Sequence, residues 1–312
     1  MGRAREGTRL SRAVRLAAPA KVNLTLEVIG TRADGYHELR SVFATIDLAD
    51  RVRVASATRL DVRVRPDPGA VAELSARAVA ALAAATGRLA AAHVRVTKQI
   101  PVAAGLGGGS SDAGAVLRGL ATIWRTDRNL AAVGATIGSD VPFFASGAGF
   151  ALVEGRGERV RELPRPAERL WIVLVRVAAR VATADVFAAL RREEWSDGAD
   201  SAALARSFDD RRVAPATIRA HLRNDLLDAA SRVCRDIGEA RLIAGSKGVT
   251  LALSGSGPSL FAVADSRPDA LRLARILRAQ GLHASARELG ATGEKAVRPS
   301  AVHLTSSSGR RR

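Results

Sequence analysis

Short alternations of apolar and polar residues run through the first 100 residues of the chain. Residues 14–30 contain two of them, separated by a brief break, and the stretch LTLEVIG is typical of a half-buried strand. The same reasoning indicates strands at residues 41–57, 60–66 and 92–101. Residues 70–86 are instead rich in alanine and end at Gly87, which predicts a helix.

The middle of the chain predicts a helix followed by a hairpin. An alanine-rich run ends at residue 124, and we expect it to be helical and capped by Ser110 or Ser111. A short helical stretch leads into residues 137–144, and residues 149–163 have the pattern of two strands joined by a tight turn. Two prolines around residues 163–168 indicate a boundary. We therefore expect an N-terminal domain at 13–165 and a C-terminal domain at 166–300.

The second half of the chain predicts the order β-α-α-β-β-α-β. Its strand patterns lie at residues 169–177, 248–254 and 259–265 and at a last strand after residue 281. Its helical patterns lie at residues 183–195, 217–244 and 268–281, with a polar connector expected at 196–210. Residues 1–12 and 301–312 are expected to be basic, disordered tails. The predicted fold class is α+β, with two domains.

Composition bounds the class of protein. The chain has 312 residues and is 47% hydrophobic, which is enough for a packed core. Its apolar stretches fall short of the ~20 residues that cross a membrane. The basic N-terminus has no apolar segment of the kind found in secretory signals. Cys234 is the only cysteine, so an internal disulfide is excluded. We expect a soluble cytoplasmic protein that does not bind membranes.

The net charge of +17 favours an anionic partner. Nucleotides, phosphorylated metabolites and nucleic acids all fit such a charge. Aromatic residues make up only 4% of the chain, too few for the stacking platforms of single-strand binders, and no zinc finger or basic zipper is present. We therefore expect no nucleic-acid partner, although a nucleic-acid-binding protein with a basic surface stays an alternative.

Lysine is scarce among the basic residues. Only Lys21, Lys98, Lys247 and Lys295 interrupt the use of arginine. A lysine kept in such a chain suggests a position where a compact ammonium group is required.

Residues 101–117, PVAAGLGGGSSDAGAVL, place four glycines between a predicted strand and a predicted helix. Backbone amides exposed by glycine, together with the positive end of the helix, favour an anion site. The P-loop pattern does not fit because no lysine follows the glycines, and the dinucleotide fingerprint fails because Ser110 occupies its third glycine position. A flexible linker is disfavoured because the stretch does not lie between domains.

The fuller string resembles the phosphate-binding motif of the galactose, homoserine, mevalonate and phosphomevalonate (GHMP) kinase superfamily. Within it, GLGGGSSDA is most similar to the kinases of 4-diphosphocytidyl-2-C-methyl-D-erythritol. Four further stretches resemble motifs of those kinases and follow in the expected order: PAKVNLTLEV from Pro19, RADGYHEL at 32–39, IGSDVPFF at 137–144, and LSGSGPSLFAV at 253–263. NDLL at 224–227 also fits.

The resemblance implies a two-domain GHMP kinase fold, with an N-terminal domain like domain 2 of ribosomal protein S5 and a ferredoxin-like C-terminal domain. It implies a cleft between them, ATP and Mg²⁺ as cofactors, and phosphorylation of the substrate's 2-hydroxyl in the non-mevalonate isoprenoid pathway. The ATP-binding residues would be Pro101, Ala104, Gly105, Leu106, Gly107, Gly108, Gly109, Ser110 and Ser111. Ser111 would also help to hold Mg²⁺, although simple helix capping would equally explain the serines.

Two charged residues would carry the chemistry. Asp140 would be the general base, although an Asp before Val-Pro is more often a turn residue. Lys21 would lie beside it and stabilise phosphoryl charge. The substrate-binding residues would be Asn23, Tyr36, His37, Thr183, Phe187, Gly255, Ser256 and Gly257. For Phe187 a core position, and for the glycines a tight hairpin, are the alternatives.

Some positions depart from the family pattern. Ala103 and Gly114 replace a usual glycine and a usual alanine, and the segment before Thr183 lacks a Pro-Gly turn. A kinase of homoserine, mevalonate or a sugar is the alternative within the superfamily, but such substrates offer no cytidine to Tyr36 and His37. The sequence leaves open whether the protein is a monomer or a homodimer.

Overall fold

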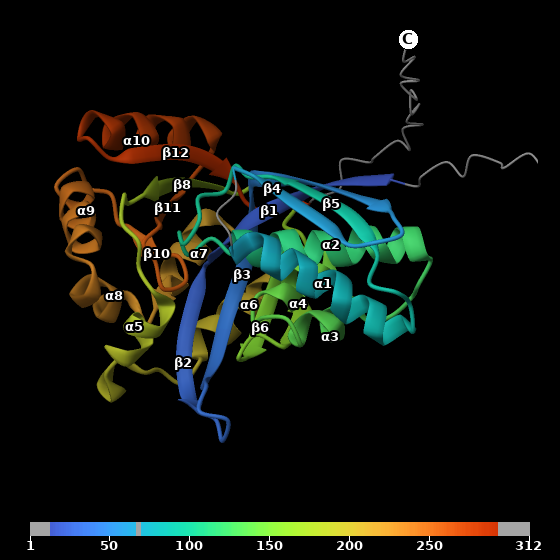
Figure 1. The fold of residues 1–312 in the computed structure, drawn as a ribbon. Helices are drawn as coiled ribbons and strands as arrows, with labels where there is room; N and C mark the ends of the chain where they lie inside the picture. Colours follow the sequence, from blue (N-terminus) through green and yellow to red (C-terminus); the bar gives the residue numbers. More distant parts are fainter. Residues whose placement is uncertain (1–12, 67–69, 293–312) are drawn as a thin grey trace, which may run out of the picture.

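Two β-sheets organise residues 13–66 and 70–292, which are the parts of the chain that the computed structural model describes (Figure 1). The tails expected at 1–12 and 301–312 lie outside these residues. The larger sheet has eight strands: β1 (Ala13–Asn23), β2 (Thr25–Thr31), β3 (His37–Ser56), β4 (Asp61–Arg65), β5 (Ala92–Thr97), β6 (Phe150–Gly155), β7 (Arg159–Glu162) and β9 (Arg223–Asn224).

Strand β3 is the centre of the larger sheet. It is 20 residues long and pairs antiparallel with β1, β2, β5 and β6. The β2–β3 hairpin extends beyond the body of the molecule in Figure 1. The sheet is covered by α1 (Ala70–Thr86), α2 (Gly108–Trp124), α3 (Leu130–Ala135) and α4 (Val141–Ser146). Apolar residues of α1 and α2 pack against Val52, Val54 and Val94, so this face of the sheet is one core.

The second sheet is antiparallel throughout and has the order β10-β11-β8-β12. Its strands are β10 (Ala252–Leu253), β11 (Leu260–Ala264), β8 (Trp171–Arg176) and β12 (His283–Glu288). The remaining helical elements are α5 (Thr183–Ala188), the 3₁₀ turn η1 (Arg192–Glu194), α6 (Ala199–Asp209), α7 (Pro215–His221), α8 (Leu227–Val233), α9 (Arg235–Gly245) and α10 (Arg267–Ala279).

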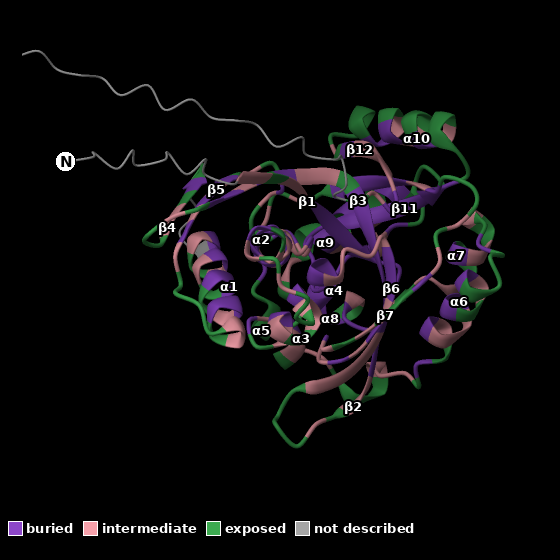
Figure 2. Cartoon of the chain, turned by 90° about the vertical axis from the view of Figure 1, so that its right-hand side faces the viewer, coloured by how far each residue is buried: buried purple, intermediate pink, exposed green. Residues whose placement is uncertain are grey.

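Both faces of the second sheet are buried. In β8, Val173 and Val175 pack with α8, α9 and α10, whereas Ile172 and Leu174 pack with β1, β3 and α6. Successive side chains of a strand point to opposite faces, so a continuous apolar run serves two cores. In Figure 2 most of β6 and β11 is coloured as buried, while α10 turns an exposed face outward.

The sequence predicted most of these elements, including the 149–163 hairpin and the helix at 70–86, and the α+β class is confirmed. The polar connector expected at 196–210 is wrong, because α6 is a helix with Ser201, Leu204, Ala205 and Phe208 buried on one face. The helix expected at 183–195 ends early: α5 stops at Ala188, and η1 follows. Strand β9 was not predicted.

The second half of the chain also completes the first sheet. Strand β9 pairs in parallel with β2, and residues of α6 and α7 pack in a core with β1 and β3. The two halves are therefore joined by shared strands and a shared core. Within the described segments, no helix combines the length and apolar character needed to cross a membrane.

Candidate active site

A cavity of about 730 Å³ lies where the β2–β3 turn, the start of α4, the β6–β7 turn and the loop before β11 meet. A cavity of this size suits a nucleotide-sized ligand. It brings together ten residues selected from the sequence: Lys21, Asn23, Tyr36, His37, Ser110, Asp140, Thr183, Phe187, Gly255 and Ser256.

Lys21 lies on β1 at the floor of this cavity and is only 4% exposed. Its ammonium group donates to Asn23 Oδ1 at 2.7 Å and lies 3.5 Å from Asp140 Oδ2. It also stands 4.5 Å from the centroid of the Phe43 ring. A buried ammonium needs such partners because desolvation is costly.

Asn23 shares a strand face with Lys21 because it lies two residues further along β1. Its amide nitrogen donates to Ser41 Oγ at 3.0 Å, and Ser41 in turn donates to the Thr25 carbonyl. This chain of hydrogen bonds fixes the amide with its oxygen toward Lys21. Asn23 therefore positions the ammonium group.

Asp140 occupies the N-cap position of α4, yet its carboxylate makes no capping hydrogen bond within the described structure. Its side chain is 29% exposed and faces Lys21 across the cavity. A carboxylate that neither caps a helix nor is fully paired can accept a proton from a ligand. The turn-residue alternative explains its backbone but not its orientation.

The glycine-rich loop runs alongside β1 and meets the loop of the second half. Lys21 N donates to the Leu106 carbonyl at 3.0 Å, and Ser254 Oγ donates to the Gly105 carbonyl at 3.1 Å. A Cβ on Gly105 would lie 2.5 Å from the Ser254 carbonyl oxygen, closer than any real contact allows. Gly105 is therefore required because two backbones touch.

The helix α2 begins at Gly108, with Gly107 as a left-handed N-cap at φ 68°. The capping expected from Ser110 or Ser111 is wrong: both lie inside the first turn, and no side-chain cap bond is described. The amides of Gly108, Gly109 and Ser110 precede the first intrahelical hydrogen bond, which Ser111 N donates to the Gly107 carbonyl, and the positive end of the helix dipole adds to them. An anion can be bound here.

The other residues of the predicted ATP site differ in what they expose. Ala104 and Leu106 have buried side chains in the core, so only their backbone is available to a ligand. Ser110 lines the cavity, whereas Ser111 is buried and donates its hydroxyl to the Pro19 carbonyl at 2.6 Å. Pro101 and Gly107–Gly109 are partly buried.

An aromatic cluster forms the outer end of the cavity. The rings of His37 and Phe187 stack with centroids 4.9 Å apart, and Trp195 approaches His37 edge-on at 5.4 Å. Tyr36 is 53% exposed at the tip of the hairpin. Burial lowers the pKa of His37, which favours the neutral imidazole at pH 7. Phe187 lines the cavity and also packs on the second core.

The loop before β11 supplies the opposite rim. Ser256 shares a hydrogen bond of 2.9 Å with Thr183 through their hydroxyl oxygens, and Gly255 lies next to Lys21 and Asn23. Gly257 does not line the cavity; a Cβ there would meet Leu253 and Ile237.

Sequence reasoning assigned no role to Asn224, which holds this rim in place. Its amide nitrogen donates to the Leu253 and Gly255 carbonyls, both at 2.9 Å, while its Oδ1 accepts from Leu226 N. The NDLL string was the available signal. Trp195 was also missed, because a single tryptophan in a polar stretch has no periodic pattern.

A buried charge cluster lies behind the glycine-rich loop. Lys98 Nζ donates to Asp112 Oδ2 at 2.7 Å and also to Asp50. The sequence placed Asp112 in the first turn of the helix, but it lies one turn deeper and is fully buried. Burial raises its pKa to about 7, opposed by Lys98 and reinforced by Asp50.

The departures from the family pattern have structural reasons or costs. A Cβ on Gly114 would lie 2.6 Å from Phe144 Cβ, so glycine there lets α2 and α4 approach closely. Ala103 has φ 55°, a left-handed conformation that strains a residue with a side chain.

Comparisons with known proteins show the family of this chain. A family model described as the GHMP kinases N terminal domain matches residues 73–148. A 4-diphosphocytidyl-2-C-methyl-D-erythritol kinase from Brevibacillus brevis is 38% identical over 274 residues, covering 85% of this chain and 92% of the relative. The enzyme of the same name from Geobacter sulfurreducens is 39% identical, with 87% and 97% covered.

Solved structures show the same relationship. A crystal structure of 4-(cytidine 5'-diphospho)-2C-methyl-D-erythritol kinase has a TM-score of 0.73 at 35% identity, covering 89% of this chain and 100% of that one. Homoserine kinase from Cytophaga hutchinsonii has a TM-score of 0.67 at 17% identity, covering 94% and 98%, which shows a common fold alone.

Proposed function

Because this chain belongs to the 4-diphosphocytidyl-2-C-methyl-D-erythritol kinase family, and is therefore a GHMP kinase of the non-mevalonate isoprenoid pathway, we propose that Asp140 and Lys21 carry out its phosphoryl transfer. The reaction moves the γ-phosphoryl group of ATP to the 2-hydroxyl of the cytidyl substrate. The observation that carries the assignment is the Lys21–Asp140 pair at the cavity floor.

Each member of the pair has one task. Asp140 accepts the proton of the hydroxyl, which becomes a stronger nucleophile as the new P–O bond forms. Lys21 places a positive charge beside the transferring group, where negative charge accumulates. Its hydrogen bond to Asn23 holds the ammonium in place through the reaction.

We place the phosphates of ATP at the start of α2. The amides of Gly108, Gly109 and Ser110 stand at the positive end of a 17-residue helix. The glycines keep this backbone open to a ligand.

Mg²⁺ fits the donors present. Ser110 and Asp140 offer oxygen atoms to the same cavity, and Mg²⁺ typically takes one or two protein oxygens plus substrate phosphates. When bound, Mg²⁺ neutralises phosphate charge. We assign the ligand role to Ser110, because the hydroxyl of Ser111 is bonded to Pro19.

We place the cytidine at the aromatic end of the cavity. Tyr36 offers an exposed ring for stacking, and neutral His37 can both donate and accept at the edge of a base. Phe187 supports the His37 ring from behind. Asn23 and Gly255 lie next to Lys21 and, together with Thr183 and Ser256, would bind the alcohol end, with Gly257 shaping the loop.

We also propose where the enzyme acts and in which oligomeric state. A small-molecule substrate requires neither a membrane nor a nucleic acid, and we place the enzyme in the cytoplasm as a monomer or homodimer.

Asp140→Asn tests the assignment. We expect kcat with 4-diphosphocytidyl-2-C-methyl-D-erythritol to fall about 10²–10⁴-fold, since the base is removed but the shape is kept. The KM values for both substrates should change little. ATP consumption measured beside homoserine and mevalonate would show turnover with the cytidyl substrate alone.

Asp210→Asn is the matched control, because Asp210 is an exposed residue at the end of α6. It should leave kcat unchanged. An Asp140→Asn enzyme with more than a tenth of wild-type kcat would contradict the role of Asp140 as base. Turnover of homoserine or mevalonate would contradict the substrate.

A further inference from the structure

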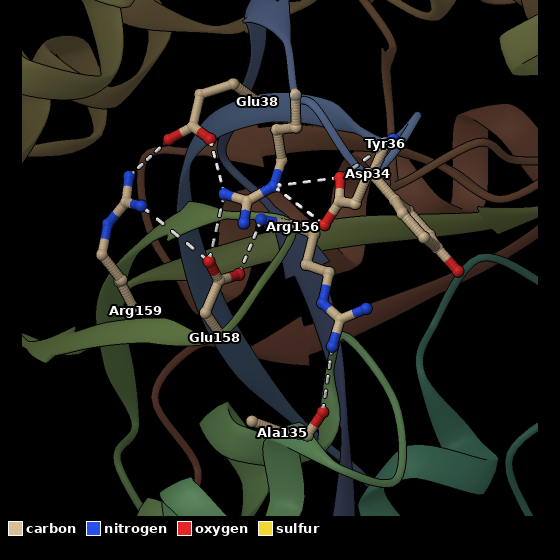
Figure 3. A network of polar contacts seen from close by, with 8 residues as sticks. Asp34, Tyr36, Glu38, Ala135, Arg156, Glu158 and Arg159 are labelled. Carbon is tan, nitrogen blue, oxygen red and sulfur yellow. Dashed lines mark hydrogen bonds and ion pairs between the residues drawn. The ribbon is translucent and has the colours of Figure 1, made fainter.

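The turn between β6 and β7 forms one wall of the cavity, and Arg156 is its only charged residue there. Arg156 is partly buried. Its guanidinium lies 5.4 Å from the centroid of the Tyr36 ring and 3.5 Å from the Ala135 carbonyl oxygen (Figure 3). Neither contact neutralises its charge.

The neighbouring arginines are all paired with carboxylates. Arg32 lies 2.8 Å from Glu38 and 3.2 Å from Glu158, and Arg159 also pairs with Glu38. Figure 3 shows this network beside the β2–β3 and β6–β7 turns, and the Arg156 side chain extends away from it. Within residues 13–66 and 70–292, Arg156 has no carboxylate at ion-pair distance. Its charge is therefore available to a ligand.

The backbone of the turn is held firmly. Arg156 N donates to Glu158 Oε2 at 2.7 Å, and Glu158 is tied to Arg32. The next residue, Gly157, packs so closely on the segment before Asp140 that a Cβ would lie 2.1 Å from the Ser139 carbonyl oxygen. The turn thus has a fixed position relative to the reaction centre.

Arg156 consequently stands between the two ends of the site. Tyr36 lies on one side of it, and the Ser139–Asp140 segment lies on the other. In the substrate, a diphosphate joins the cytidine to the reacting alcohol. A ligand with its base at Tyr36 and its hydroxyl at Asp140 places that diphosphate beside Arg156.

We propose that Arg156 binds the diphosphate of the substrate and so determines specificity for a cytidine diphosphate-linked alcohol. This inference rests on the proposed function. A guanidinium matches phosphate oxygens through two parallel hydrogen bonds. The cavity wall is largely apolar, with Leu26, Leu39 and Val153, which strengthens a charged pair there. Lys21 is already paired with Asp140, so it does not serve this anion.

The test compares two ligands that differ only in the diphosphate. Cytidine and cytidine 5'-diphosphate are titrated by calorimetry into wild type and Arg156→Gln. We expect the variant to bind the diphosphate about 10–100-fold more weakly, while cytidine affinity changes less than about threefold. In turnover, KM for the cytidyl substrate should rise and KM for ATP should not.

Arg156→Lys keeps the positive charge but cannot form two parallel hydrogen bonds. Its affinity for cytidine 5'-diphosphate should lie between those of wild type and Arg156→Gln. Arg159→Gln, on the same hairpin, is the matched control because Arg159 lies outside the cavity lining. This variant should keep the wild-type ratio of affinities for cytidine 5'-diphosphate and cytidine. An equal loss for cytidine and its diphosphate would overturn the proposal, since Arg156 would then act through the Tyr36 ring. A rise in KM for ATP alone would also overturn it.

Failure of the proposed function gives a different result. A wild-type protein that binds neither ligand contradicts both statements. A wild-type protein that binds the diphosphate through Arg156 without turning over the alcohol supports Arg156 and contradicts the reaction.

Discussion

Lys21 and Lys98 are buried in a chain that otherwise uses arginine for positive charge. Each ammonium lies between two or more oxygen atoms, which suits a compact point charge. The exposed Lys247 shows no such contact among the described residues. Scarcity of lysine was therefore a useful signal for two positions, although it did not distinguish the reaction centre from a structural cluster.

Single-residue detail at the glycine-rich loop could not be predicted. Ser110 and Ser111 are adjacent and chemically identical, yet one lines the cavity and the other is buried against Pro19. Adjacent helical side chains point about 100° apart, so one of two neighbouring serines can face the cavity while the other faces the core. The sequence locates the helix start only to within about two residues, which is too coarse to tell which serine is which.

Gly105→Ala should destabilise the protein. Its φ of 71° alone costs an alanine about 1–3 kcal/mol, and the methyl group would also push against Ser254 and Gly257. Thermal unfolding should show a clear drop in Tm together with weaker ATP binding.

Gly238→Ala is the matched control, since Gly238 lies within α9 and a Cβ there meets nothing within 4 Å. We expect a gain of about 0.5–1 kcal/mol from helix propensity. A Gly105→Ala protein as stable as wild type would disprove the close contact between the two loops.

Among the elements, α2 both lines the cavity and holds a buried ion pair. Its first turn faces the cavity, while Asp112, one turn later, is tied to Lys98 at the end of β5. Two carboxylates share this one ammonium, and Asp112 Oδ1 has no hydrogen-bond partner among the described residues. The cluster therefore favours keeping a proton.

The stability of the protein should depend on this proton. The pKa of Asp112 rises from 3.8 to about 7 on folding, so between these values the folded state binds more protons than the unfolded state. Stability then falls as pH rises through this window, by at most about 1.4 kcal/mol per pH unit. Asp112→Asn should flatten the slope between pH 5 and 8 in urea unfolding.

Glu194→Gln serves as the control, because a hydrogen bond from Arg232 lowers the pKa of Glu194. Its contribution is lost only as pH falls below the usual Glu range, so the slope between pH 5 and 8 should match that of wild type. Identical slopes for wild type and Asp112→Asn would contradict the raised pKa.

The missed helix α6 shows why composition misleads for an element. Its stretch contains Asp200, Arg206 and Asp209, which gives it the appearance of a polar connector. Its buried positions nevertheless repeat at helical spacing, from Ser201 to Phe208. The helical period of apolar positions was present in the sequence, but serine and alanine at two of the four positions made the pattern weak.

At the scale of the whole molecule, the GHMP kinase fold was predictable because the glycine-rich loop and four further motifs occur in the right order along the chain. The arrangement between motifs was not predictable. One connection between the halves is made by Asn224, whose amide hydrogen bonds link β9 in the first sheet to the loop before β11 in the second half.

Asn224→Asp should weaken that connection. The substitution keeps the shape but removes two hydrogen-bond donors and directs a carboxylate at two carbonyl oxygens. We expect a loss of about 2–4 kcal/mol in unfolding free energy at pH 8 and a fall in activity.

Asn129→Asp is the paired control, because Asn129 caps α3 by accepting from Ala132 N, which aspartate also does. It should be nearly neutral. Equal effects of the two substitutions would mean that Asn224 does not hold the loop through its donors.

Strand β9 limits how far the halves can be exchanged between relatives. It comes from the second half of the chain but forms the edge beyond β2 in the first sheet. A fragment ending near residue 165 would present β2 as an open edge with unpaired backbone groups, which invites aggregation. A chimera of two homologues joined near residues 163–168 would therefore combine β2 from one protein with β9 from the other. These two strands must still pair, although β9 is only two residues long and lies far downstream.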